Sequence, residues 1–191
     1  TLMSLNTRTV IIRVRGISPL IVHAWSIKAI RQIEDAQQKK AKKAKEAKNP
    51  EDEFQGCFYK DADGNYCIPA RAFKGAMVSA ATSIDDKRFP KTKIRQAIFV
   101  NGDLLKIRHS AEPNMRTDMV RLGGTTADVR YRPEFSEWEV DLPVTFNASV
   151  LSLEQVVNLV NLSGFAVGVG EWRPEKNGNF GRFEVVKGGD E

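Results

Sequence analysis

Cysteine and histidine are scarce in this 191-residue chain, which contains two of each: Cys57, Cys67, His23 and His109. Two cysteines cannot build the disulfide framework of a small secreted protein, and the four residues lack the short paired spacing of a zinc site. The cysteines flank a turn at residues 61–65 in a predicted hairpin that places Cys67 opposite Lys60, so a cross-strand disulfide is disfavoured. We therefore expect free thiols, no metal and no cofactor.

Long apolar runs are also absent. No segment approaches the roughly 18 consecutive apolar residues of a membrane helix, and the N-terminus shows no signal-peptide core followed by a cleavage site. The composition, with 41% apolar residues, is sufficient for a hydrophobic core and predicts one domain over residues 1–191. We expect a soluble cytoplasmic protein without a membrane partner.

Positive charge is unevenly distributed. The net charge of +5 is carried entirely by the segment from Lys28 to Lys48, which has eight basic and three acidic residues. Ile27, Ile30 and Ile33 have helical spacing and predict that the first half of this segment docks on the core. Its second half has no apolar stripe, so an exposed Lys-rich helical insertion at about 26–50 is favoured over a dedicated nucleic-acid arm. Because the remainder is neutral, a nucleic-acid surface must come from the arrangement of charges.

Hydrophobic periodicity predicts the order of the elements. In the first half we expect a strand at 7–15, the insertion helix at 26–48, a hairpin formed by 54–59 and 66–68, and a helix at 70–81 with Ala70, Phe73 and Met77 inward. Gly75 lies inside that helix, at a cost of about 1 kcal/mol relative to alanine, and close helix–sheet packing is the favoured reason, with ligand approach as the alternative.

In the second half, Asn101-Gly102 predicts a hairpin of 97–100 with 104–108, and residues 110–128 are expected to form a long thumb-like loop. Residues 129–132 and 137–147 are predicted to pair. A helix with a Ser152/Gln155 capping box should end at Gly164, before a strand at 182–186. Without its insertions, the chain reads as an α+β, ferredoxin-like (RRM-like) β-α-β-β-α-β core with an antiparallel sheet.

A glycine-rich segment between the last helix and the last strand is the most informative motif. Four glycines allow its backbone to approach a ligand closely, three basic residues supply charge, and two aromatic rings can stack on bases: Gly168, Gly170, Gly178, Gly181, Arg173, Lys176, Arg182, Trp172 and Phe180. No Gly-Lys-Ser/Thr follows, so it is not a P-loop. The same composition also suits a glycine-rich turn that packs its aromatics on its own core.

Three segments in this order resemble the RAMP superfamily of CRISPR proteins, most closely its Cas7-like branch. They are Gly16-Ile-Ser-Pro-Leu20, Tyr66-Cys-Ile-Pro-Ala-Arg-Ala-Phe-Lys-Gly-Ala-Met77 and the glycine-rich segment. The chain differs from the family by Ala70 in place of a glycine and by Trp172-Arg173-Pro174 in a lengthened loop. The resemblance extends equally to a stand-alone relative of phage or prophage origin, which would act in the host cytoplasm.

This resemblance implies a non-catalytic subunit that binds single-stranded RNA, or single-stranded DNA in a divergent relative. Such a subunit assembles side by side along the nucleic acid as a homo-oligomer or filament, or with other subunits of a ribonucleoprotein. The glycine-rich segment would contact the strand, and Arg71 and Lys74 would add charge from the helix at 70–81. Met115, Arg116 and Arg121 would lie in a thumb that wedges between bases or contacts a neighbouring subunit.

Two other functions stay open. A metal-independent endoribonuclease similar to the Cas6 branch would use a histidine as general acid or base, and His23 or His109 could serve. A viral structural or assembly protein would use the loops for contacts between subunits. We expect no catalysis, because neither histidine has an evident second catalytic partner in the sequence.

Overall fold

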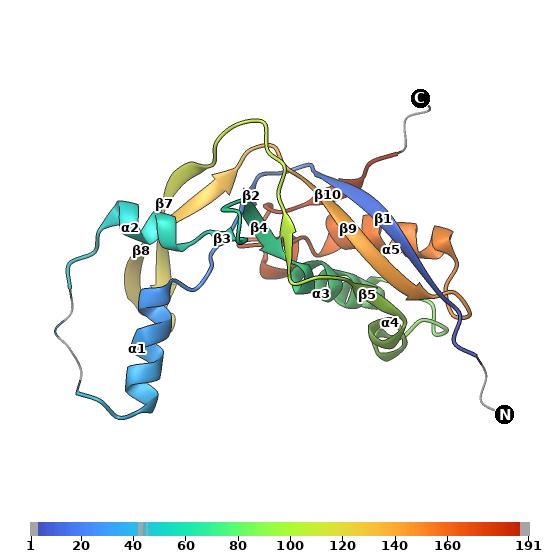
Figure 1. Ribbon diagram of the computed structural model, residues 1–191, viewed down its shortest axis with the longest axis horizontal. Coiled ribbons are helices and arrows are strands. Elements are labelled where there is room, and N and C mark those ends of the chain that lie inside the picture. The colour runs from blue at the N-terminus through green and yellow to red at the C-terminus, as the bar shows by residue number, and fades with distance from the viewer. Residues whose placement is uncertain (1–3, 42–43, 45, 188–191) are drawn as a thin grey trace.

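Four strands form the central sheet of the computed structural model, which describes residues 4–41, 44 and 46–187 (Figure 1). β10 (Phe183–Val185), β1 (Thr7–Gly16), β9 (Glu139–Asn147) and β5 (Ile98–Val100) lie in this order, and each neighbouring pair is antiparallel. Alternation along β1 buries Ile12 and Val14 and leaves Ile11 exposed. The fold is therefore mixed α+β with an antiparallel sheet, as the sequence predicted.

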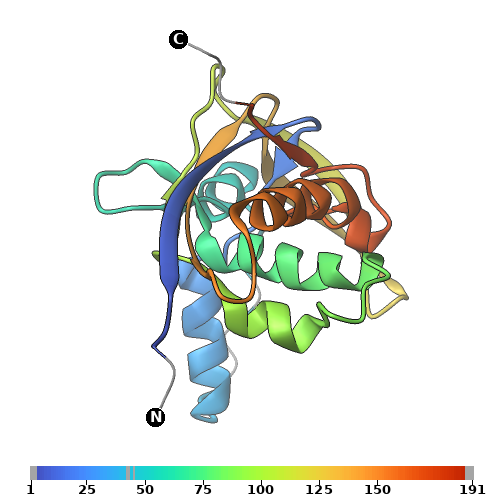
Figure 2. The same ribbon diagram turned by 90° about the vertical axis from the view of Figure 1, so that its right-hand side faces the viewer.

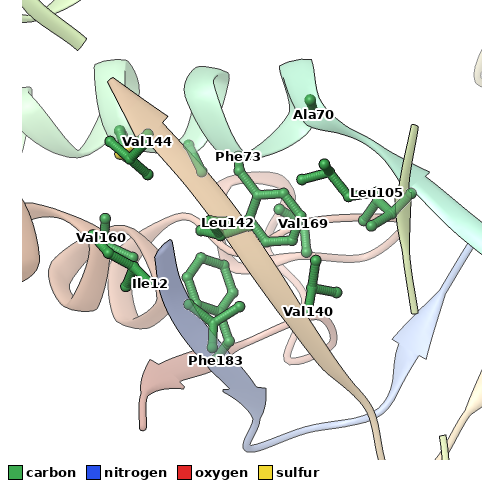
Figure 3. Close-up of a cluster of buried hydrophobic side chains, with 14 of the residues drawn as sticks. Ile12, Ala70, Phe73, Leu105, Val140, Leu142, Val144, Val160, Val169 and Phe183 are labelled. Carbon is green, nitrogen blue, oxygen red and sulfur yellow. The ribbon is translucent and has the colours of Figure 1, made fainter. Parts of the chain in front are cut away.

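Two helices cover the apolar face of this sheet, α3 (Ala70–Ala80) and α5 (Leu153–Ala166) (Figure 2). Phe73 of α3 and Val160 of α5 meet Leu142 and Phe183 of the sheet in the core (Figure 3). The predicted inward face of α3 and the Ser152/Gln155 capping box of α5 are both confirmed.

The last helix continues past its predicted end at Gly164. A Cβ at that position would lie 2.0 Å from the carbonyl oxygen of Phe183, so the glycine allows α5 to pack closely on β10 and is not a cap. Helix α4 (Lys91–Ala97) and the short η1 (Ala81–Ser83) complete the connection from α3 to β5.

Two smaller sheets flank the central one. β2 (Leu20–Ile21), β8 (Thr126–Phe135) and β7 (Asn114–Leu122) form one, and β3 (Tyr59–Lys60), β4 (Tyr66–Pro69) and β6 (Leu104–Lys106) form the other. The predicted loop at 110–128 is thus wrong for most of its length, because it forms the hairpin β7–β8. Its strands carry polar residues on both faces, so the alternation that marks a half-buried strand is missing from the sequence.

Two predicted strand pairings are also wrong, and a third, the hairpin of 54–59 with 66–68, is confirmed only in part and with another register. The Asn101-Gly102 turn joins β5 to β6, which belong to different sheets, and β8 pairs with β7 and β2 and not with β9. Residues 50–56 form helix α2 (Pro50–Gly56), capped by Asn49, and only Tyr59–Lys60 pairs with β4, placing Cys67 opposite Tyr59. Local turn signals locate a turn but do not choose the partner strand. Both cysteines are free, as predicted.

The Lys-rich insertion is only partly helical. α1 (Ile27–Gln37), capped by Ser26, projects from the body of the molecule (Figure 1), and the described residues from 38 to 49 form no further helix. Ile27, Ile30 and Ile33 are 70%, 43% and 43% exposed, so the prediction that they dock on the core is wrong. Three of the predicted lysines, Lys42, Lys43 and Lys45, lie outside the described residues. None of the helices in the described ranges has the length and apolarity to cross a membrane.

Candidate nucleic-acid groove

Helix α3 and the glycine-rich segment enclose two adjoining hollows. The larger, of about 350 Å³, lies between Arg71, Gly75 and Ser79 of α3 and Gly168, Arg173 and Glu175 of the segment, and we call it the α3–loop groove. The smaller, of about 190 Å³, is lined by His23, Tyr59, Ile68 and Glu171, and we call it the His23 pocket. Arg71 and Arg173 line both hollows, so the two lie side by side.

The glycine-rich segment is anchored at its start and exposed further on. Val167 and Val169 are buried, and Val169 lies beside Phe73 in the core (Figure 3). Beyond them, Arg173 is partly exposed, and Pro174–Lys176 form the short helix η2, where Glu175 and Lys176 are exposed. The segment is therefore neither sealed in the interior nor a free loop.

Its glycines serve mainly its own folding. At Gly181, which has φ +69°, a Cβ would lie 1.7 Å from the carbonyl oxygen of Val169, and at Gly178 a Cβ would lie 1.7 Å from that of Trp172. A Cβ at Gly170 would lie 2.4 Å from the carbonyl oxygen of Ile21. The self-packed alternative that the sequence left open thus accounts for these three positions, whereas Gly168 and Gly170 also line the groove.

Charge in the α3–loop groove is partly compensated. Arg173 donates from Nε to Glu175 Oε2 at 3.0 Å and from Nη1 to the carbonyl oxygen of Gly170 at 3.0 Å. Ser79 donates to the other oxygen of Glu175 at 3.1 Å. Burial raises the pKa of Glu175, but the bonds from Arg173 and Ser79 and the nearby positive charges lower it overall, so the carboxylate stays ionised. Arg71, by contrast, has no ion-pair partner among the described residues.

Gly75 opens the floor of this groove. A Cβ built on it would meet no heavy atom within 4 Å, so the predicted explanation, close helix–sheet packing, is wrong. Gly75 lines the groove instead, which favours the alternative that a ligand approaches the helix there.

The two aromatic rings of the segment face arginines. The Arg132 guanidinium lies 4.8 Å from the centre of the Trp172 ring, and Arg116 lies 4.7 Å from that of Phe180 and 5.2 Å from that of Trp172. Asp118 accepts from Arg116 Nε at 2.8 Å and from Arg132 Nη2 at 3.0 Å. These contacts join the hairpin β7–β8 to the glycine-rich segment, and they hold the Arg116 side chain between Asp118 and the two rings.

Sequence reasoning did not single out Arg132. It is 3% exposed, and the sequence pattern of Val129-Arg-Tyr-Arg132 predicts a strand and nothing more specific. The one available signal was an arginine in a strand followed by the apolar Phe135, which is not specific.

Several predicted contact residues line neither hollow. The Lys74 ammonium lies 3.8 Å from the centre of the Phe99 ring, and burial lowers its pKa. The Arg182 guanidinium lies 5.2 Å from the centre of the Phe165 ring. Lys176, Met115 and Arg121 are exposed and also lie outside both linings. Of the predicted basic residues, the structure brings only Arg71 and Arg173 together.

The two histidines have different surroundings. His23 lines the His23 pocket, and its pKa is lowered, chiefly by burial, with Glu171 acting in the opposite direction. His109 Nδ1 lies 2.9 Å from the carbonyl oxygen of Ala111, and its ring packs against Tyr66 and Phe135, outside both hollows. Only His23 is placed where it can contact a ligand in the groove.

Comparisons with known proteins do not assign a function to this chain. No protein-family model and no curated protein matches the sequence. Among solved structures, the chain is similar to the crystal structure of Cmr6 from Pyrococcus furiosus, with 12% sequence identity, coverage of 96% of this chain and 100% of that chain, and a TM-score of 0.48. With a TM-score below 0.5, this likeness shows no fold family, ligand or partner for the chain.

Proposed function

We propose that this chain binds single-stranded nucleic acid, RNA in preference to DNA, without cleaving it, and that the sugar-phosphate backbone lies in the α3–loop groove. The observation that carries this proposal is the pairing of an open helix surface at Gly75 with Arg71 and Arg173 on the walls. Arginine side chains on a shallow groove suit phosphates, and such contacts supply affinity with little sequence preference.

The arrangement of the three RAMP-like segments supports the same proposal. Gly181 of the glycine-rich segment donates to the carbonyl oxygen of Pro19 at 2.8 Å, and the Arg182 amide donates to Ser18 Oγ at 3.0 Å. Arg71, from the segment 66–77, faces the same groove. The first segment therefore packs against the glycine-rich segment, and the glycine-rich segment shares the groove with the middle segment.

The strand order supports a ferredoxin-like, RAMP-type core. In the central sheet the order β10-β1-β9-β5 places the fourth core strand beside the first, and the third between the first and the second. Helices α3 and α5 follow the first and third of these strands. We also propose that the chain assembles side by side along the nucleic acid, either with further copies of the same chain or with other ribonucleoprotein subunits.

Fluorescence anisotropy with labelled single-stranded RNA and DNA over a salt series tests the proposal. Arg71→Ala should weaken binding to every sequence and reduce the slope of log K against log salt by about 1. Lys74→Ala removes the same charge from the same helix but outside the groove, and should bind nearly as the unmodified protein does. Equal losses in both variants, or no binding of either nucleic acid, would contradict the proposal.

The endoribonuclease remains the second candidate, because His23 shares a depression with Arg71 and Arg173. With its pKa lowered by burial, the ring is neutral at pH 7 and suited to accept a proton. Incubation of labelled RNA without metal decides between them: cleavage products that disappear in His23→Ala would favour the enzyme.

A further inference from the structure

We propose that the His23 pocket receives one base of the bound strand and that Glu171 at this pocket selects adenine or cytosine over uracil. This inference rests on the proposed function, because the base is delivered by a backbone in the α3–loop groove. It adds a specificity that phosphate contacts cannot provide.

The pocket has the size and walls of a base site. At about 190 Å³ it is smaller than the roughly 300 Å³ or more of drug-sized ligand sites, and it suits one flat ring system. Val22, Ile68 and Pro69 supply apolar walls, and His23 and Tyr59 supply rings on which a base can stack.

The polar groups of the pocket are available to a ligand. Within the described ranges, no hydrogen bond involves the His23 ring or the Tyr59 hydroxyl. Burial lowers the pKa of His23 and raises the pKa of Tyr59, so at pH 7 the first is neutral and the second keeps its proton. A neutral imidazole avoids repulsion by Arg130 and Arg132 and can both donate and accept.

Glu171 provides the selectivity. Its amide donates to the carbonyl oxygen of Ile21 at 2.9 Å, which fixes the residue at the edge of the pocket, and its side chain is 42% exposed. Arg132 Nη1 forms an ion pair with Oε2 at 3.7 Å, which is beyond hydrogen-bond distance, so the carboxylate oxygens can still accept hydrogen bonds from a ligand. A carboxylate accepts from the amino group of cytosine or adenine. Uracil offers no amino group, and the carbonyl oxygens beside its ring N–H repel a carboxylate.

The connection between the two hollows makes the base and phosphate contacts compatible. Arg71 and Arg173 line both the α3–loop groove and the His23 pocket. A phosphate held by these arginines therefore lies at the entrance of the pocket, where the base of an adjoining nucleotide can turn inward. We infer that one base in the footprint is read, while the rest of the strand is bound through its backbone.

Binding of short RNA homopolymers of adenine, cytosine and uracil tests the inference. The unmodified protein should bind the adenine and cytosine strands about tenfold more tightly than the uracil strand, the effect of roughly 1.5 kcal/mol, which is the lower end for one hydrogen bond to a charged group. Glu171→Gln should reduce this difference to less than about twofold, because an amide can also donate to the uracil carbonyls. Tyr59→Ala should weaken binding of all three strands.

Glu154→Gln is the matched control, since it removes one negative charge from an exposed position on α5 that lines neither hollow. It should keep the base preference. Salt-sensitive binding of all three strands with equal affinity, unchanged in Glu171→Gln, would overturn the pocket and leave the proposed function intact. No binding of any strand would overturn both.

Discussion

Arg173 donates from Nη1 to the carbonyl oxygen of Gly170 at 3.0 Å, so the loop's principal cation also holds the loop's backbone in place. Its Nε is engaged by Glu175 at the same distance. An incoming phosphate can use the remaining donors of this guanidinium, but it is repelled by the negative charge of Glu175 beside them. The affinity of the groove is therefore set by a balance of charges within it.

Arg173 and Arg182 should behave differently when each is replaced by alanine. Arg173→Ala should weaken binding of any strand and lower the salt slope by about 1, because Arg173 lines the groove. Arg182→Ala should leave both unchanged, since this side chain packs on Phe165. Anisotropy titrations at several salt concentrations measure both effects, and an equal loss in Arg182→Ala would contradict the groove.

Replacement of Glu175 should strengthen binding. Glu175→Gln removes the negative charge that pairs with Arg173 and leaves a side chain that can still accept from Ser79. The expected gain is up to about fivefold, the effect of losing an exposed ion pair of up to about 1 kcal/mol. Titrations with one labelled strand measure it. An unchanged affinity would mean that phosphate does not enter between α3 and η2.

Two substitutions at Gly75 should affect stability and nucleic-acid binding differently. Gly75→Ala should stabilise the protein by up to about 1 kcal/mol, because alanine favours a helix interior and its methyl group would meet no atom. Gly75→Glu should fold as well as the unmodified protein but lose most nucleic-acid binding through its bulk and charge in the groove. Thermal unfolding and anisotropy on the same samples give both results; full binding by Gly75→Glu would place the strand elsewhere.

Stability at low pH should depend on Asp118. Burial raises its pKa, but hydrogen bonds from Arg116 and Arg132 and their charges lower it overall. A carboxyl group whose pKa is depressed in the folded state contributes stability that is complete above its unfolded pKa of about 3.9 and is lost as pH falls through the folded value.

Asp118→Asn should therefore lower the free energy of unfolding by about 3 kcal/mol at pH 7, because Arg132 is buried and, among the described residues, its Nε already has no hydrogen-bond partner. The difference from the unmodified protein should shrink below about pH 4. Urea unfolding at a series of pH values measures it. A difference that stays constant down to pH 2 would show that the pair with the arginines is not the cause.

Helices and strands could be predicted from the sequence where a single local pattern, such as apolar alternation or a capping box, was strong. Alternation gave β9, with Val140, Leu142 and Val144 inward, and the Ser152/Gln155 pair gave the start of α5. Hairpin β7–β8 was missed because its strands are stabilised by Asp118 and Arg132 and by Trp172 packing, which leave no periodic apolar pattern.

For the candidate site, the sequence determined which residue types are present: a segment rich in glycine and arginine, a glycine at position 75 of a predicted helix, and too little cysteine and histidine for a metal site of ordinary spacing. The tertiary structure decided which of them share a surface. Arg71 and Arg173 are 102 positions apart and line one groove, whereas Lys74, three residues from Arg71, packs on Phe99. Helix rotation and strand pairing between distant segments set these neighbours, and neither is encoded in the spacing of residues along the chain.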